Sequence, residues 1–210
     1  MNFDEIFPTI DQDLGAADSL REEVLQKTRK IVRMASEAIK AVHREQWDQA
    51  ESRIDEMKVM LQDVREQVGK HQMLIRRNYT EGCEQEFAEA AILYSILHDN
   101  KFVNPEDLEI PSLSWLLGLA DVAGELRRHS LDAIRKGNIP AAQQSLELME
   151  DIYSHLFSLD YPKGLTGGLR EKTDMVRKLL QATRGEVAMA SHTARLNDNL
   201  EKFLAEREQE

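Results

Sequence analysis

The stretch Leu113-Ser-Trp-Leu-Leu-Gly-Leu-Ala-Asp-Val-Ala-Gly-Glu-Leu126 places two acidic residues inside an almost uniformly apolar segment. A helix that is apolar nearly all round is buried in a core or an interface. Asp121 and Glu125 are four residues apart, so they share one face of such a helix. Asp is rarely buried without a partner, and no Lys or Arg lies three or four residues from Asp121 on either side. Asp121 therefore needs a basic residue from another helix, or a cation.

A second acidic pair lies earlier in the chain, in Gly82-Cys-Glu-Gln-Glu-Phe-Ala-Glu-Ala90. Glu86 and Glu89 are three residues apart and would lie side by side on a helix. Four carboxylates on two helices suit Mg²⁺ or Mn²⁺, which prefer oxygen ligands and keep several waters. Such ions activate water and neutralise a phosphate during hydrolysis. Glutamates at this spacing are also common on exposed helix surfaces, so a solvated face is the alternative for Glu86 and Glu89.

The rest of the chain has the composition and periodicity of helices. Good helix formers run between five scattered prolines, and apolar residues recur at spacings of three and four, as in residues 24–42, 57–68 and 87–97. No stretch alternates long enough to predict a strand. We predict one all-α domain over residues 1–210, a bundle of about six to seven long helices, with frayed ends at about 1–13 and 204–210. The helices are expected at residues 14–46, 47–70 (with an extension toward 78), 80–98, 112–136, 139–157 and 166–203, with a loop over 99–111.

Several classes of protein are excluded by composition. The single cysteine, Cys83, allows no internal disulfide and no zinc cluster, and it fits a reducing cytoplasm. No histidine follows a Glu by three residues, as ferritin-like di-iron sites require, and no P-loop is present. The start of the chain does not resemble a signal peptide, and no apolar run is long enough to cross a membrane. These observations predict a cytoplasmic protein without a membrane partner.

The charge of the chain bears on nucleic-acid binding. Its 38 acidic and 27 basic residues give a net charge of −11, which argues against a general nucleic-acid coat protein but allows one local basic surface. Arg29 and Arg33 lie four apart on the first helix, and Arg76 and Arg77 precede the third. We interpret these four as phosphate contacts, the alternative being a solvated face with ordinary ion pairs. No aromatic residues are interleaved with them, so recognition would depend on backbone and shape.

Both acidic segments resemble the translin family, and more closely its catalytic branch, the translin-associated factor X proteins. Residues 82–90 are similar to that branch's Gly-x-Gln-Glu-x-x-Glu-Ala, with one extra residue after the glycine. Residues 115–126 follow its Tyr-Leu-Leu-Gly-x-x-Asp-x-x-Gly-Glu-Leu pattern. Thr28-Arg29-Lys30, Arg76-Arg77 and Leu169-Arg-Glu-Lys-Thr-Asp174 extend the resemblance along most of the chain.

The resemblance implies an all-α fold of about seven helices and assembly into a hollow octameric homo-oligomer that binds RNA inside. It places Glu86, Glu89, Asp121 and Glu125 on the acidic catalytic positions of the factor X branch, which is a Mg²⁺-dependent endoribonuclease. Plain translin lacks the equivalent of Asp121 and binds nucleic acid with little or no cutting. The compact length suits a prokaryotic homologue, such as an archaeal one.

Together, the residues and the resemblance predict an endoribonuclease that uses Mg²⁺, with Mn²⁺ as a substitute. Glu86, Glu89 and Asp121 would hold one or two ions, Glu125 would be a ligand or a water-positioning base, and metal-activated water would attack the phosphodiester. Single-stranded RNA is the expected substrate, with duplex RNA and DNA as further candidate partners. The alternatives are a non-catalytic single-stranded RNA- or DNA-binding translin-like protein, an all-α nucleotide pyrophosphatase, and a helical scaffold whose carboxylates pair with arginines.

Overall fold

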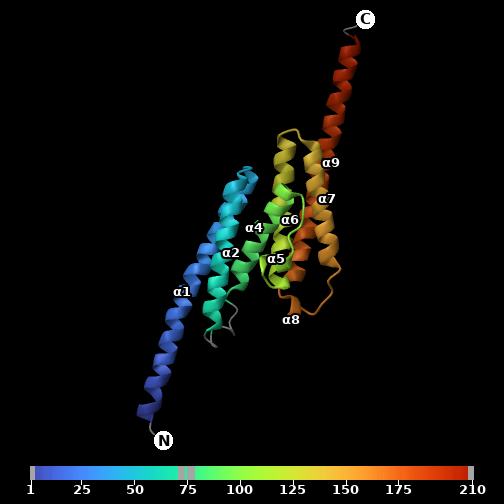
Figure 1. The fold of residues 1–210 in the computed structure, drawn as a ribbon. Helices are drawn as coiled ribbons and strands as arrows, with labels where there is room; N and C mark the ends of the chain where they lie inside the picture. The colour runs from blue at the N-terminus through green and yellow to red at the C-terminus, as the bar shows by residue number, and fades with distance from the viewer. Residues whose placement is uncertain (1–2, 71–73, 75–78, 208–210) are drawn as a thin grey trace. The chain divides into compact units, whose positions relative to one another are not determined.

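The computed structural model describes residues 3–70, 74 and 79–207 of the chain. Every regular element in these residues is a helix (Figure 1), which confirms the predicted all-α class. The chain divides into two compact units, residues 1–118 (the first unit) and 119–210 (the second unit). The prediction of one domain over residues 1–210 stays a prediction.

The first unit is a set of antiparallel helices. Lys27 on the first helix pairs with Asp63 on the second, while Glu37 further along the first pairs with Arg53 earlier on the second, so the two run in opposite directions. The predicted apolar stripes form the core, and Val24, Ile31 and Phe87 are fully buried. The helices are α1 (Phe3–His43), α2 (Trp47–Gly69), α4 (Glu81–Asp99), the short α5 (Pro105–Leu108) and the first turns of α6 (Ser112–Arg135).

The second unit continues α6 and adds α7 (Ile139–Phe157), α8 (Lys163–Thr166) and α9 (Leu169–Arg207). The turn from α6 to α7 needs a glycine, because Gly137 has a φ of +76° that residues with a side chain rarely adopt. Asn138 then caps α7 by accepting a hydrogen bond from the Ala141 backbone N–H. The core of this unit is formed by Leu126, Met149, Ile152, Leu156, Val176 and Leu180.

The first turns of α6 pack against α4 without a side chain between them. A Cβ atom at Gly118 would lie 2.6 Å from the Ala88 Cβ, 2.7 Å from the Gln85 carbonyl oxygen and 2.9 Å from the Glu89 backbone nitrogen. All three distances are well below the ~3.5–4.0 Å at which carbon atoms pack. Position 118 therefore requires glycine, and the start of α6 lies directly on the α4 turn that includes Glu86.

The helix boundaries differ from the prediction mainly at the start of the chain. α1 begins at Phe3 rather than near residue 14, although Pro8 lies inside it. Proline removes a backbone hydrogen bond and crowds the carbonyl four residues before it, but the apolar spacing of three to four residues continues through this segment. The short helix α5 falls within the loop predicted over 99–111, α8 falls at the gap between the last two predicted helices, and α9 runs unbroken through Gly185.

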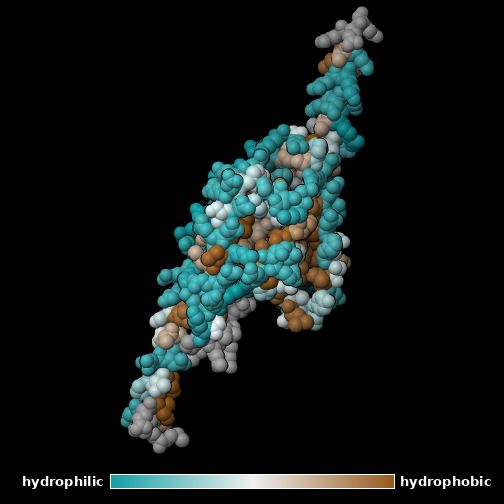
Figure 2. Space-filling model, viewed as in Figure 1, coloured by the Kyte–Doolittle hydropathy of each residue, from teal (hydrophilic) through white to brown (hydrophobic). Residues whose placement is uncertain are grey.

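The outer parts of two helices carry exposed apolar side chains. All side chains described between residues 3 and 16 of α1 are exposed, as are those from Arg195 to Arg207 of α9. Figure 2 shows apolar surface along the beginning of α1. No helix in the described part of the chain combines the length and apolar character required to cross a membrane. The exposed apolar residues of these two segments are Phe3, Ile6, Phe7, Ile10 and Leu14 in α1, and Leu196, Leu200, Phe203 and Leu204 in α9.

Replacement of Gly118 by alanine should destabilise the protein by about 2 kcal/mol, because the added methyl group must push α6 away from the α4 backbone. The measurement is urea unfolding followed by circular dichroism at a fixed protein concentration. Gly124→Ala is the matched control on the same helix. Its Cβ would meet only the Leu179 Cδ1 at 4.0 Å, so it should stabilise the helix by up to about 1 kcal/mol. Equal stability of the two variants would contradict the tight contact.

Candidate functional site

Two of the predicted carboxylates lie one turn apart on α4, in the first unit. Glu86 and Glu89 are partly buried, while the residues between and around them, including Phe87, Ala88 and Ala90, are fully buried. Both side chains are therefore shielded from solvent only in part. The two carboxylates lie at the edge of a core helix.

The α4 turn is fixed by a third carboxylate. Glu84 is only 3% exposed. Its Oε1 accepts hydrogen bonds from Arg65 Nε at 3.0 Å and Nη2 at 2.7 Å, and its Oε2 accepts one from the Ser114 hydroxyl at 2.7 Å. Arg65 also donates to the Glu109 carbonyl. This network joins α2, α4 and the start of α6, and it determines where the turn with Glu86 and Glu89 lies.

Cys83, next to Glu84, is not a nucleophile. Burial, and then the negative charge of Glu84, raise the pKa of the thiol to about 12. The neutral thiol donates a hydrogen bond to the Thr80 carbonyl at 3.0 Å. A cysteine in this state packs as a small apolar residue, because only the thiolate reacts readily.

The other two predicted carboxylates lie one turn apart on α6, in the second unit. Asp121 and Glu125 are partly buried, with side chains 28% and 24% exposed. Lys172 Nζ on α9 donates to Asp121 Oδ1 at 2.5 Å, so the partner that Asp121 was predicted to need is a basic residue from another helix. Glu125 pairs with Arg128, three residues further along α6, with 3.6 Å between Oε2 and Nη1.

The four carboxylates lie in two pairs, Glu86 with Glu89 in the first unit and Asp121 with Glu125 in the second. Among residues 3–70, 74 and 79–207, no three His, Cys, Asp or Glu side chains are grouped as a site for a metal ion. The metal therefore stays a prediction.

The predicted basic surface is described in part. Arg29 and Arg33 are exposed one turn apart on α1, which suits phosphate contact. Arg76 and Arg77 lie outside the described residues. Arg127, by contrast, donates to Glu186 and to the Thr183 hydroxyl, and the Glu186 carboxylate raises its pKa. Arg127 is therefore structural.

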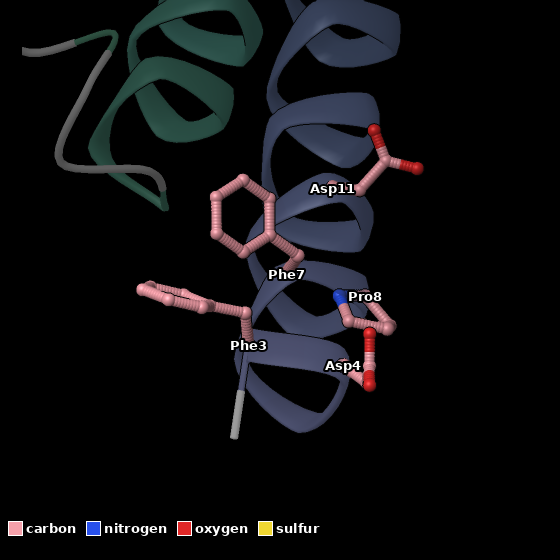
Figure 3. A pocket seen from close by; sticks show the side chains of 5 residues that line it. All are labelled: Phe3, Asp4, Phe7, Pro8 and Asp11. Atoms are coloured by element: carbon pink, nitrogen blue, oxygen red, sulfur yellow. The ribbon is translucent and has the colours of Figure 1, made fainter. Parts of the chain in front are cut away.

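A surface hollow on α1 has no part in this chemistry. Its lining residues all belong to one helix: Phe3, Asp4, Phe7, Pro8 and Asp11. Figure 3 shows Phe3 and Phe7 on one side of the helix and the two aspartates on the other. The lining of the hollow includes none of the predicted site carboxylates or arginines.

Most of the sequence matches a known family. Residues 19–182 match the model of the translin family. The chain belongs to the translin family. A relative from Methanocaldococcus jannaschii, itself an uncharacterized protein, is 33% identical over 194 residues, which cover 90% of this chain and 84% of the relative. This relative agrees with the expected archaeal kinship.

Solved structures show the same fold as this translin-family chain. AfC3PO in complex with duplex RNA is 27% identical, with a TM-score of 0.81, and the match covers 91% of this chain and 98% of that one. AfC3PO alone is 27% identical over 90% and 98% of the two chains, with a TM-score of 0.79. Apo-NeC3PO has the same TM-score at 21% identity, over 88% of this chain and 96% of that one, and indicates the fold alone.

Two residues beside the carboxylates of this translin-family protein were not predicted from its sequence. Glu84 was not predicted to be buried, although its spacing of three and seven from Phe87 and Ala91 places it on the core face of α4. Lys172 was not predicted to pair with Asp121. It lies three residues after Leu169 and four before Val176, both buried, so helical spacing alone places it beside the core stripe of α9.

Replacement of Glu84 by glutamine should lower the free energy of unfolding by about 3 kcal/mol, because the partly buried Arg65 loses its charged partner. Urea unfolding at fixed protein concentration measures the loss. Glu66→Gln, an exposed change on α2, is the control and should stay within about 0.5 kcal/mol of the wild type. A Glu84→Gln variant as stable as the Glu66→Gln control would show that the network does not hold the three helices together.

Proposed function

We propose that this protein binds RNA and cuts it as an endoribonuclease that depends on Mg²⁺ or Mn²⁺. One observation carries the proposal: the half-buried Asp121, in an apolar helix, binds a cationic group at the position that resembles the acidic residue of the factor X branch. Membership of the translin family supports RNA as the ligand, as does the likeness to AfC3PO, which has been solved with duplex RNA. Single-stranded RNA is the proposed substrate, and duplex RNA and DNA are further candidates.

The donor set fits a hard divalent cation. Glu86, Glu89, Asp121 and Glu125 offer only carboxylate oxygens, which Mg²⁺ and Mn²⁺ prefer. Their partial burial weakens the screening of their charges by water. The Lys172 ammonium shows that positive charge is accepted at Asp121. We propose that Glu86, Glu89 and Asp121 hold the ion and that Glu125 is a further ligand or a base.

A bound divalent ion would supply the positive charge that makes water a nucleophile and neutralises the phosphate. The protein supplies the remaining parts. A Glu125 carboxylate oxygen orients the water and accepts its proton. The Arg29 and Arg33 guanidinium groups, with Arg76 and Arg77, hold the RNA phosphates. Because water and not the 2′-hydroxyl attacks, the downstream product should carry a 5′-phosphate, and no 2′,3′-cyclic phosphate should form.

The second candidate is a non-catalytic nucleic-acid-binding protein. It is favoured by the Lys172–Asp121 ion pair, which neutralises Asp121 without a metal. A protein that retains RNA but leaves it intact at every Mg²⁺ and Mn²⁺ concentration would select this candidate.

We propose that the protein works as a homo-oligomer, an octamer by resemblance, with RNA inside. The exposed apolar residues of α1 and α9 support self-association, because monomers rarely leave such continuous stripes in water. An interior lined by Arg29 and Arg33 would also reconcile RNA binding with the net charge of −11. Native mass spectrometry measures the number of copies, and a monomer at micromolar concentration would refute the assembly.

Replacement of Asp121 by asparagine should reduce RNA cleavage at least about a hundredfold, since losing even an indirect partner of a metal costs 10–100-fold. Cleavage of end-labelled single-stranded RNA is measured with Mg²⁺ and with chelator. RNA binding and circular dichroism should be unchanged. Asp132→Asn, which removes the exposed partner of Arg135 on the same helix, is the control and should cut normally. Full activity of Asp121→Asn would exclude this site.

Replacement of both Arg29 and Arg33 by glutamine should weaken the binding of RNAs of different sequence to the same extent. The slope of log K against log salt should fall by about 1.4, because each phosphate contact with a single strand contributes roughly 0.7. Arg135→Gln serves as the control, since Arg135 pairs with Asp132. If the double variant and the control have the same slope, these arginines do not contact phosphate.

A further inference from the structure

We propose that Lys40 and Arg44 form a second phosphate clamp at the end of α1, which acts together with Arg29 and Arg33 and sets how long an RNA must be to fill the site. The inference deepens the proposed function and rests on it only in taking the sugar-phosphate backbone of RNA as the ligand. It lies entirely within the first unit.

Four cations share one exposed face of α1: Arg29, Arg33, Lys40 and Arg44. Successive residues of an α-helix are rotated by about 100°, so these positions fall within about 80° of one another. Arg44 directly follows the last helical residue, and its backbone N–H donates to the Ala41 carbonyl at 3.0 Å, so the chain still follows the helical turn. The face therefore carries two cationic pairs, with the exposed Ser36 between them.

The positive charge of this face is not neutralised by the described part of the chain. Basic residues of the first unit that lie between α1 and α2 are paired, Lys27 with Asp63 and Arg53 with Glu37. None of the four cations on the outer face pairs with a carboxylate of residues 3–70, 74 or 79–207. With 38 acidic residues in the sequence, the lack of a partner here does not reflect a shortage of acids.

The spacing of the four cations is unfavourable unless an anion binds. Arg29 and Arg33 are four residues apart, as are Lys40 and Arg44, and like charges at this spacing repel each other on a helix. The helix dipole attracts cations in the last turn only, so it does not explain the arginine pair, which lies further back along α1. A polyanion accounts for both pairs, because it attracts each cation in turn.

The side chains of this face suit a phosphate backbone and not unstacked bases. No aromatic residue occurs between Phe7 and Trp47, so the face offers no ring on which a base could stack. Guanidinium and ammonium groups donate to phosphate oxygens, and such contacts fix position without reading sequence. Binding at the second clamp should therefore depend on salt and not on base sequence.

Helix geometry gives the distance between the two clamps. Their midpoints are about 11 residues apart, which is about 16 Å at 1.5 Å per residue, and the four cations together span about 22 Å. A stacked strand advances about 3.4 Å per nucleotide, so an RNA needs about seven nucleotides to reach all four cations. A shorter RNA fills one clamp or the other.

The experiment measures the binding of labelled single-stranded RNA to the full-length protein in chelator, over a series of salt concentrations. With an RNA of about 20 nucleotides, Lys40→Gln/Arg44→Gln should lower the slope of log K against log salt by about 1.4, since each phosphate contact contributes roughly 0.7. Lys40→Arg keeps the charge and should keep the slope. An unchanged slope in the double variant would overturn the inference.

The matched control is Arg170→Gln/Lys178→Gln. It removes two exposed cations of α9 and so changes the net charge of the protein by the same amount. The control should keep the wild-type slope. If it lowers the slope as much as Lys40→Gln/Arg44→Gln does, the effect belongs to net charge and the clamp is refuted.

RNA length provides a second readout. An RNA of about ten nucleotides should bind Lys40→Gln/Arg44→Gln about fivefold more weakly than the wild type, the size expected for two exposed ion pairs. An RNA of about four nucleotides should lose at most about twofold, because Arg29 and Arg33 still hold it and only one of two alternative sites is gone. Equal losses for the two RNAs would contradict a second clamp.

A purely structural role predicts a different result. If Lys40 and Arg44 served only the α1 dipole, their replacement would lower the midpoint of urea unfolding and leave the salt slope unchanged. Circular dichroism shows whether each variant is folded. Should the double variant be misfolded, Lys40→Gln and Arg44→Gln replace it singly, each with an expected slope change of about 0.7.

The outcomes separate this inference from the proposed function. A slope lowered by Lys40→Gln/Arg44→Gln, with RNA left intact by the wild type at every Mg²⁺ and Mn²⁺ concentration, would support the clamp and refute the nuclease. Metal-dependent cleavage by the wild type with an unchanged slope in the double variant would do the reverse. A wild type that does not bind RNA would refute both.

Discussion

Burial of the Glu84 carboxylate constrains how the helices of the first unit meet. A buried charge is costly unless it is paired and fully hydrogen-bonded, and here the Arg65 guanidinium and the Ser114 hydroxyl satisfy both oxygens. Each group comes from a different helix, so α2, α4 and the start of α6 can satisfy this carboxylate only in one arrangement. The positions of Glu86 and Glu89 follow, because they share the next turn of α4.

The partly buried Asp121 carboxylate is also paired with a basic side chain, but with one of a different kind. The planar guanidinium of Arg65 binds Glu84 through two nitrogen atoms, which fixes direction as well as charge. Lys172 offers Asp121 a single point charge on a flexible stem. The arginine pair is nearly closed to water, whereas the lysine pair is partly open. The protein thus contains one acid in a nearly closed pair with two nitrogen contacts and one acid in a partly open pair with a single nitrogen contact.

The sequence predicted most of the fold and part of the candidate site. The apolar stripes gave the long helices, because a period of 3.6 residues is a strong signal. Pro8 concealed the first turns of α1, since a proline is usually taken as a helix boundary.

For the site, the isolation of Asp121 among apolar residues predicted that it needs a partner. The spacing of residues along one helix cannot identify a partner on a helix that is distant in the sequence. Lys172 could be found only once α9 was placed beside α6. The burial of Glu84 was readable from its spacing, yet its charge favoured a surface position.

The contact at Gly118 also has a consequence for the mobility of the first unit. A crossing built from side chains can absorb a small displacement, because its rotamers can repack. At Gly118 the backbone of one helix lies against the backbone of another and the Ala88 methyl group. Such a joint freezes no side-chain torsion at position 118 when it forms, but the glycine backbone loses more freedom there than another residue would. Because no side chain of residue 118 can rearrange between the two helices, a shift of α4 would be transmitted directly to the start of α6.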